Sequence, residues 1–154
     1  MSAGETNEPI RVTCTRRVQF CAGHRVLGHE GKCANMHGHN YVVLFTAEAP
    51  ELDSVGRVID FSVLKEMLGG WIEREWDHGF LYCEEDESFD SLFAGLFIKH
   101  KHFRCSFNPT AENMAEFLLG LGNELLKPNG INITQVTVWE TENCYATAQV
   151  TNHT

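Results

Sequence analysis

Three histidines near the start of the chain have the residue type and spacing of a metal site. His37 and His39 are separated by Gly38 alone, and side chains two residues apart on a β-strand point to the same side. They could therefore hold one metal ion together, with His24 as a third ligand. Three histidines leave a fourth position open, as in catalytic zinc sites, and neutral imidazole suits zinc. The alternative is that a histidine on an apolar face is a hydrogen-bonded core residue.

Cys33 lies four residues before His37, in a polar loop. A nearby divalent cation would lower the pKa of its thiol and stabilise the reactive thiolate, which makes Cys33 a candidate acid or base. Two other roles remain open. The thiol could pack as a small buried group, or it could be a fourth metal ligand that closes the site and makes it structural.

Asp77, His78 and Glu140 are further candidates. Asp77 could orient the imidazole of His78 for proton transfer, although the local pattern favours an ordinary surface pair at the end of a helix. Glu140 ends an apolar strand pattern, where a carboxylate is commonly solvated. It could also accept two parallel hydrogen bonds from the N–H edge of a pterin or guanine. The basic stretch 99–104 is either solvated or binds phosphate.

Length and composition indicate a single domain, 1–154. The chain has 154 residues, of which 43% are hydrophobic and 21% charged, and these values are ordinary for a globular protein. It lacks a run of about 18 apolar residues that could span a membrane. Its first residues lack the features of a secretion signal, so we expect a cytoplasmic protein with its six cysteines reduced. The net charge of −9 argues against a nucleic-acid partner.

The elements that must position these groups follow from the hydrophobic pattern. Alternation predicts a strand from Val12 to His24 and a second from His37 to Ala47, each with histidine on its apolar side. Asp60 and Thr110 are good helix caps, and an apolar stripe at helical spacing follows each of them.

The sequence pattern of the C-terminal part predicts a hairpin of two strands, 131–140 and 143–150. Residues 1–9 are expected to be disordered, and 83–107 is expected to be a long inserted loop with one helical turn. The order of elements is strand, strand, helix, helix, strand, strand. It indicates an α+β fold in which helices cover one face of an antiparallel sheet.

Six short motifs together resemble the 6-pyruvoyl-tetrahydropterin synthase family, and the resemblance covers most of the chain. The motifs are Phe20–His24, Cys33–Tyr41, Asp60-Phe61, Asp77-His78, Pro109–Asn113 and Glu140-Thr141. The resemblance implies a tunnelling (T-) fold, an antiparallel four-stranded sheet with two helices packed on one face. It also implies a homo-hexamer built from two trimers, with active sites between subunits.

The same resemblance implies a role for each candidate residue. Zinc binds the three histidines, and Cys33 matches the catalytic cysteine of the family. Asp77 and His78 match its proton-transfer pair. Glu140 matches the residue that anchors the pterin, and Thr110 is a weaker match to the pterin pocket.

A cysteine four residues before His-Gly-His resembles the bacterial 6-carboxy-tetrahydropterin synthases of queuosine biosynthesis. We therefore expect a zinc-dependent lyase that converts 7,8-dihydroneopterin triphosphate to 6-carboxy-5,6,7,8-tetrahydropterin, acetaldehyde and triphosphate. The alternatives are a 6-pyruvoyl-tetrahydropterin synthase and a non-catalytic pterin- or purine-binding protein. The joint presence of Cys33, Asp77 and His78 argues against a mere binder. The chain departs from the family at 80–82, where Phe-Leu-Tyr replaces a Leu-Asn pair, so we expect an altered pocket rim.

Overall fold

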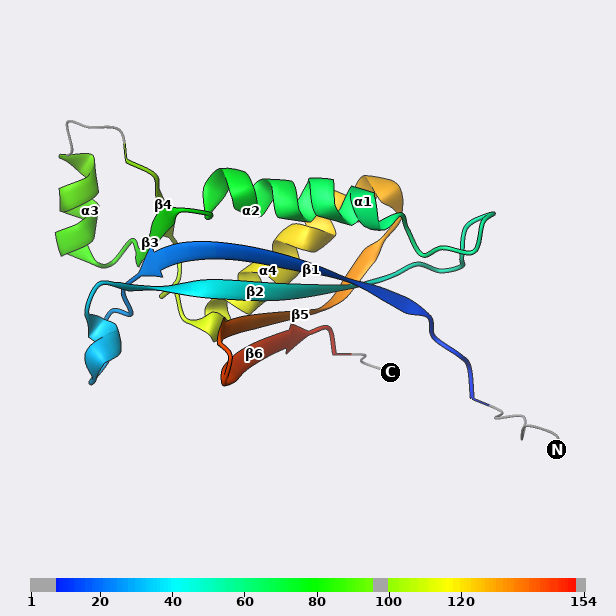
Figure 1. Cartoon of the computed structure of the whole chain (residues 1–154), viewed down its shortest axis with the longest axis horizontal. Helices are drawn as coiled ribbons and strands as arrows, with labels where there is room; N and C mark the ends of the chain where they lie inside the picture. Colours follow the sequence, from blue (N-terminus) through cyan, green and yellow to red (C-terminus); the bar gives the residue numbers. More distant parts are fainter. Residues whose placement is uncertain (1–7, 96–99, 152–154) are drawn as a thin grey trace.

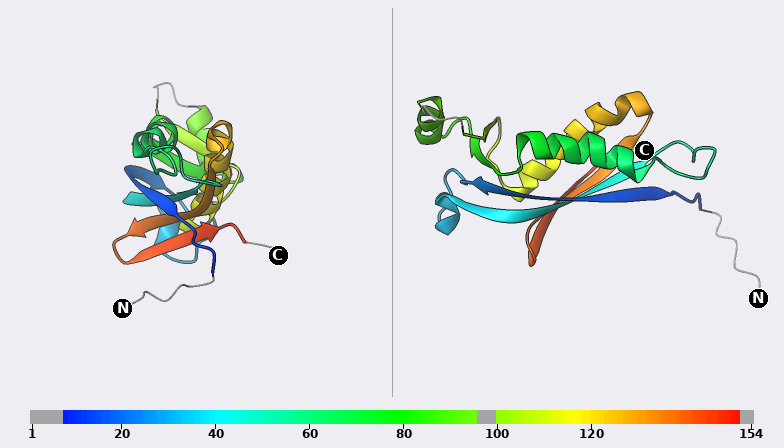
Figure 2. Two further views of the ribbon diagram at one scale, coloured as in Figure 1. Left: turned by 90° about the vertical axis from the view of Figure 1, so that its right-hand side faces the viewer. Right: turned by 45° about the horizontal axis from the view of Figure 1, so that its top comes forward.

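The computed structural model describes residues 8–95 and 100–151. Residues 8 and 9, the described part of the segment predicted to be disordered, are exposed, and residues 1–7 lie outside the described part. Two layers are visible, a long twisted sheet and helices on one of its faces (Figures 1 and 2). None of the described helices is long and apolar enough to cross a membrane.

Four strands form the predicted antiparallel sheet. The long strands β1 (Thr13–His24) and β2 (His37–Glu48) pair over their whole length. β5 (Asn132–Thr141) pairs with β2, and β6 (Cys144–Gln149) pairs with β5. The register of the first pair sets His24 directly opposite His37, so the two candidate ligands meet where the ladder ends.

Two short strands that the sequence pattern did not predict extend the sheet to six, in the order β4-β3-β1-β2-β5-β6. β3 (Gly79–Cys83) pairs in parallel with the end of β1, and β4 (His102–Cys105) pairs in parallel with β3. The helix α3 (Glu87–Ala94) lies between them. The prediction of a long loop over 83–107 was therefore wrong, because this segment forms a helix and a strand and packs with β3 in a second small core. That core contains Phe80, Tyr82, Phe89 and Phe93.

The first predicted helix is continuous but changes type along its length. It comprises α1 (Phe61–Leu64), the π-type turn η2 (Lys65–Gly69) and α2 (Gly70–Glu75). Asp60 is its cap, as predicted, because its carboxylate accepts a hydrogen bond from the N–H of Ser62 at 2.8 Å.

The second predicted helix is α4 (Ala111–Leu126), which continues into the short turn η3 (Lys127–Asn129). The hydroxyl of Thr110 accepts a hydrogen bond from the N–H of Asn113 at 3.2 Å and caps the helix. Both predicted helices lie on the same side of the sheet, as Figure 2 shows.

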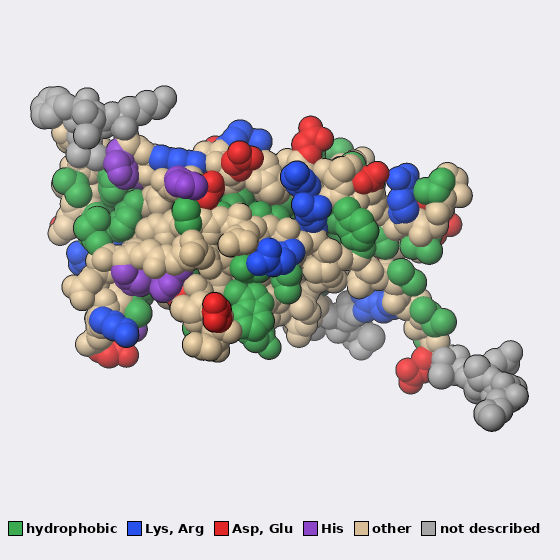
Figure 3. Space-filling view, in the orientation of Figure 1, with side chains coloured by type: hydrophobic (Ala, Val, Ile, Leu, Met, Phe, Trp, Pro, Cys, Tyr) green, Lys and Arg blue, Asp and Glu red, His purple; other side chains and the backbone are tan. Residues whose placement is uncertain are grey.

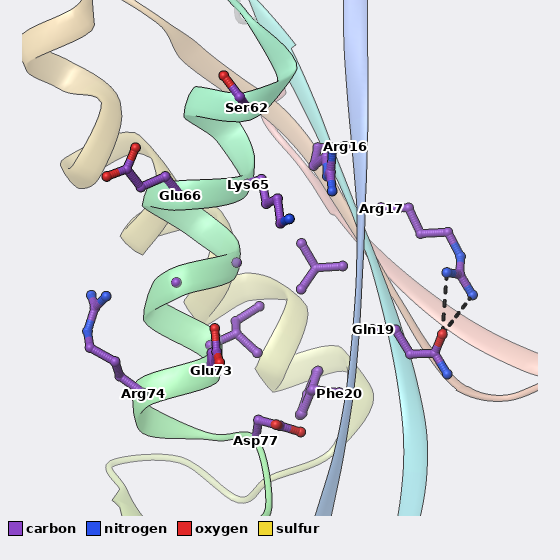
Figure 4. Close-up of a pocket in the computed structure, with 14 residues that line it drawn as sticks. Arg16, Arg17, Gln19, Phe20, Ser62, Lys65, Glu66, Glu73, Arg74 and Asp77 are labelled. Atoms are coloured by element: carbon purple, nitrogen blue, oxygen red, sulfur yellow. Dashed lines mark hydrogen bonds between the residues drawn. The ribbon is translucent and has the colours of Figure 1, made fainter.

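Side chains alternate across the sheet, and this alternation decides which groups can meet. Figure 4 shows Phe20 on the helix side of β1, whereas Arg17 and Gln19 point away from the helices. The even positions of β1 and the odd positions of β2 therefore face the core. The largest fully buried side chains include Tyr41, Phe45, Leu64, Leu68, Ile72, Trp76, Met114 and Leu118. His24 and His39 belong to this covered face.

Candidate active site

Four potential metal ligands converge at the end of the β1–β2 ladder. They are His24, His37, His39 and Glu140, whose ligand atoms all lie within 4.8 Å of one another. The Nε2 atoms of His24 and His37 are 3.0 Å apart. Oε1 of Glu140 lies 3.0 Å from Nε2 of His39 and 3.3 Å from Nε2 of His24. The described residues thus contain the predicted three-histidine cluster and add a carboxylate to it.

Backbone carbonyls orient two of the rings. Nδ1 of His24 lies 2.7 Å from the carbonyl oxygen of Pro109, and Nδ1 of His37 lies 2.7 Å from that of Asn35. A carbonyl can only accept, so in each neutral ring Nδ1 carries the proton and Nε2 presents a lone pair. Two lone pairs facing each other at 3.0 Å repel, and a cation between them turns the repulsion into binding. The residues therefore fit a divalent metal ion, with the carbonyls as outer partners.

The electrostatics of the cluster also favour a cation. Burial lowers the pKa of His39, and its histidine neighbours add to the effect while Glu140 opposes it. Contact with His24 lowers the pKa of Glu140, against the opposing effect of burial. The cluster therefore combines a neutral imidazole at His39 with an ionised carboxylate, which is a donor set that binds zinc.

The position of Glu140 depends on an irregularity in the sheet. The register between β5 and β6 shifts between Trp139 and Thr141. A bulge of this kind leaves one residue without a ladder partner and redirects its side chain. Glu140 is the residue in that interval, and its side chain is directed at the histidines. The sequence predicted its face but not this contact.

Cys33 lies beside the cluster, in the short turn η1 (Lys32–Ala34) between β1 and β2. Its side chain is half-buried. Burial raises the pKa of Tyr41, and the charges of Glu140 and Cys33 add to that shift, so the thiol lies near Tyr41, whose ring centre is 5.5 Å from that of His39. It is not among the four converging ligand atoms. The geometry therefore favours a role beside the metal over a role as its fourth ligand.

Asp77 and His78 form a second cluster, with Cys21. Oδ2 of Asp77 accepts from Nδ1 of His78 at 2.8 Å, and Oδ1 accepts from the backbone N–H of Cys21 at 3.0 Å. Burial would raise the pKa of Asp77, but these hydrogen bonds outweigh it and the net shift is downward. His78 has a φ of 61°, a conformation that non-glycine residues rarely adopt. Strain of this kind is common at functional sites.

The two clusters lie on different sides of β1. Cys21 is at an odd position and points away from the helices, whereas His24 points toward them. The imidazole of His78 is 77% exposed. Figure 3 shows histidine side chains at separate places on the end of the molecule that carries α3. Within one chain, the structure therefore does not bring Asp77 and His78 together with the metal cluster.

Part of the basic stretch 99–104 is already engaged. The ammonium group of Lys101 donates to the backbone carbonyls of Glu73 and Asp77. Arg104 forms ion pairs with Glu84 and Asp90. Residue 99 lies outside the described residues. Because Lys101 and Arg104 are engaged in these contacts, fewer positive charges of the stretch are available to bind phosphate than the sequence suggested.

Arg25, the residue after His24, is held by the inserted segment. Its Nε lies 3.2 Å from Oδ2 of Asp86, whose side chain is 2% exposed, and its guanidinium lies 5.0 Å from the ring centre of Phe89. The two terminal nitrogens of the guanidinium are not part of this ion pair. No local spacing in the sequence relates Arg25 to Asp86.

Asn108 is a further residue that the sequence did not single out. Its side-chain oxygen accepts from the N–H of Leu27 at 2.9 Å, and its side-chain nitrogen donates to the carbonyl of Leu27 at 2.8 Å. It thereby fixes the loop after His24 to the segment that carries Pro109 and Thr110. Thr110, the predicted pterin-pocket residue, stands next to the carbonyl that orients His24.

Comparison with known proteins places this chain among pterin enzymes. The profile of the family described as 6-pyruvoyl tetrahydropterin synthase matches residues 13–150. A 6-carboxy-5,6,7,8-tetrahydropterin synthase from Rickettsia bellii is 36% identical over 138 residues, which covers 87% of this chain and 97% of the relative. One from Haemophilus influenzae is 32% identical over 140 residues, covering 88% and 96%.

Solved structures share the fold. An uncharacterised protein from Wolinella succinogenes superposes with a TM-score of 0.79 at 23% identity, covering 92% of this chain and 99% of its own. The 6-pyruvoyl tetrahydropterin synthase of Caenorhabditis elegans superposes with a TM-score of 0.64 at 24% identity, covering 93% and 100%. The predicted T-fold is thus confirmed, with six strands in place of four. This chain belongs to the 6-pyruvoyl tetrahydropterin synthase family.

Proposed function

We propose that this protein is a zinc-dependent lyase that converts 7,8-dihydroneopterin triphosphate to 6-carboxy-5,6,7,8-tetrahydropterin, acetaldehyde and triphosphate. The observation that carries the proposal is the convergent histidine cluster in a chain 36% identical to a 6-carboxy-5,6,7,8-tetrahydropterin synthase over 87% of its length. A 6-pyruvoyl product is the second candidate. The solved structures named as 6-pyruvoyl synthases, such as those from Caenorhabditis elegans and Plasmodium falciparum, are less similar, at 24% and 19% identity, so we favour the 6-carboxy product.

His24, His37 and His39 would hold the zinc ion through their Nε2 atoms. Two observations support this assignment. The three nitrogens converge, and backbone carbonyls fix two of the rings. Zinc bound there would supply Lewis acidity to the hydroxyl groups of the substrate side chain. The half-buried thiol of Cys33 lies at the edge of this cluster and would accept a proton from that side chain as a thiolate.

Glu140 and Thr110 would bind the pterin ring. Glu140 lies on a bulge and is not constrained by the ladder, so its carboxylate can turn from the histidines toward the N–H edge of a pterin. Thr110 uses its oxygen as a helix cap, which leaves its hydroxyl hydrogen free to donate. Together they would fix the reacting carbons near the metal and Cys33.

His78 would be the second proton carrier. Asp77 holds the Nδ1 proton, so Nε2 is the free acceptor, and the exposed ring can reach a substrate bound outside its own chain. We propose that it completes the histidine cluster of a neighbouring copy in a homo-hexamer of two trimers. Two open edges support assembly: β6, and the part of β1 before residue 22, where β3 does not pair. Such edges favour pairing with another chain.

The triphosphate needs positive charge that the acidic chain does not provide overall. Arg25 follows His24 in sequence and is held by Asp86 and Phe89, and its two terminal nitrogens are outside that ion pair. Lys32 precedes Cys33 in the same turn and forms no ion pair with the described residues. These two cations lie close in sequence to the metal and the thiol, and we assign them to the triphosphate.

Product analysis tests the proposal. The purified zinc-loaded protein is incubated with 7,8-dihydroneopterin triphosphate, and the products are identified by mass spectrometry. Carboxy-tetrahydropterin with acetaldehyde is the expected result. A pyruvoyl product would move the protein to the second candidate function. No turnover by folded, zinc-loaded oligomers would contradict an enzymatic role and favour a binding protein.

A further inference from the structure

We propose that Cys21, Asp77 and His78 form a second metal site that binds zinc weakly and inhibits the enzyme when zinc is in excess. The thiol sulfur, one carboxylate oxygen and one ring nitrogen all lie within 4.8 Å of one another. Small side-chain rotations would therefore be enough to bring the three ligand atoms within bonding distance of one ion. The site is separate from the histidine cluster, since Cys21 points to the other side of β1.

The backbone already brings these ligands together. The N–H of His78 donates to the carbonyl of Cys21 at 2.7 Å, and the N–H of Cys21 donates to Asp77 at 3.0 Å. His78 has a left-handed backbone, and its side chain lines the same cavity as Cys21. Because the imidazole is 77% exposed, no packing prevents the small rotation that a tetrahedral site would need.

Space for an ion is present beside the ligands. A shallow cavity of about 390 Å³ is lined by Cys21, His78 and two facing glycines, Gly23 and Gly38. The two glycines are paired across β1 and β2 and present no side chain on this face. An ion on the three ligands could therefore keep a water molecule as its fourth ligand.

The donor set selects the type of metal. A thiolate, an imidazole and a carboxylate suit zinc or cobalt(II), whereas magnesium and calcium prefer oxygen alone. As the ion binds, the sulfur–hydrogen bond of Cys21 breaks, a sulfur–metal bond forms, and the proton passes to solvent. The ring of His78 is exposed, whereas the histidine cluster is more buried and two of its rings are fixed by backbone carbonyls, so we expect the second site to be weaker and to fill after that cluster.

Inhibition follows from the identity of the ligands, and this part rests on the function proposed above. A metal ion held by both Asp77 and His78 would replace the hydrogen bond between them, so the pair could no longer transfer a proton. Binding itself does not depend on that function. A spectroscopic readout of binding therefore separates failure of the metal site from failure of the proposed reaction.

Cobalt(II) titration of the metal-free protein is the first test. Variants carrying Cys33→Ser are used, so that a thiol beside the first site does not contribute. The first equivalent should give the visible bands of the histidine cluster, and the second should add a thiolate-to-cobalt charge-transfer band. Cys21→Ser should remove that band and weaken the second site by at least about tenfold. Cys144→Ser, which alters an exposed thiol on β6, should leave it unchanged.

Zinc inhibition is the second test. Turnover of the otherwise wild-type protein should fall as zinc exceeds one equivalent, and Cys21→Ser should retain its activity over the same range. Serine keeps the backbone N–H that bonds Asp77, so the basal rate should be preserved. Absence of a thiolate band at the second equivalent, or equal zinc inhibition of the Cys21→Ser variant, would overturn the proposal.

Discussion

Replacing Asn108 with alanine should weaken metal binding at a distance. Asn108 does not touch a histidine, but its two hydrogen bonds to Leu27 join the loop after His24 to the segment that carries Pro109. The carbonyl of Pro109 in turn accepts the Nδ1 proton of His24. Loss of the side chain should let this carbonyl move, so that the ring of His24 is no longer fixed.

The expected magnitudes follow from these contacts. Two side-chain hydrogen bonds to a half-buried backbone are lost, which should lower the free energy of unfolding by about 1–3 kcal/mol. Removing an outer partner of a metal-binding histidine weakens metal binding by about 10–100-fold. Asn108 acts one step further from the metal, so we expect the lower end, about tenfold, for zinc.

Asn123 provides a matched control. Its side chain also joins two backbone segments, in this case α4, to which it belongs, and β5. It donates to the carbonyls of Leu119 and Ile133 and accepts from the N–H of Ile133. Ile133 is fully buried, so Asn123→Ala should destabilise the fold at least as much, by about 2–4 kcal/mol.

Urea denaturation measures the two stabilities, and competition with a chromophoric chelator measures the two zinc affinities. The expected pattern is a loss of stability in both variants and a loss of zinc affinity in Asn108→Ala alone. If Asn108→Ala binds zinc as tightly as the wild type while it is destabilised, then the carbonyl does not orient His24. Equal losses of affinity in both variants would mean that global stability controls binding.

Replacing Cys33 with alanine should abolish turnover and leave zinc content and stability unchanged, and measurable turnover would remove this thiol from the reaction. His37→Ala should lower the zinc content from about one ion per chain, as measured by elemental analysis of desalted protein. Asp86→Ala should raise KM for the triphosphate substrate more than for its dephosphorylated form, because Arg25 loses its buried partner, and equal effects would exclude a phosphate role. Mixing inactive Cys33→Ala and His78→Ala subunits should restore about one quarter of the wild-type activity if each site uses two chains. Continued inactivity of verified mixed oligomers would contradict shared sites.

The sequence predicted the covered face of the long strands because their side chains alternate in hydrophobicity. The alternation placed His37 and His39 on one side of β2 and His24 on the matching side of β1, and the structure agrees. It did not predict that His24 would lie opposite His37. That register depends on the length and path of the loop between the strands, which carries no periodic signal.

The strand β3 was not predicted for a related reason. All five residues of β3 are buried, so the strand shows no alternation between polar and apolar positions. Parallel strands covered on both faces commonly lack this signal.

The contact between Glu140 and the histidines was missed because it depends on a bulge. The ion pair between Arg25 and Asp86 joins two segments far apart in sequence.

The parity of positions along β1 supports the proposal that each active site uses two chains. Cys21 and His24 are three residues apart, an odd number, so their side chains lie on opposite sides of the strand. The ligand atoms of Asp77 and His78 lie within 4.8 Å of the thiol of Cys21, whereas the metal cluster is built on His24. A rotation of either side chain cannot move it through the sheet. In the proposed reaction, the proton-transfer pair of one chain would therefore act on a substrate held by another chain, and assembly would be a condition of activity.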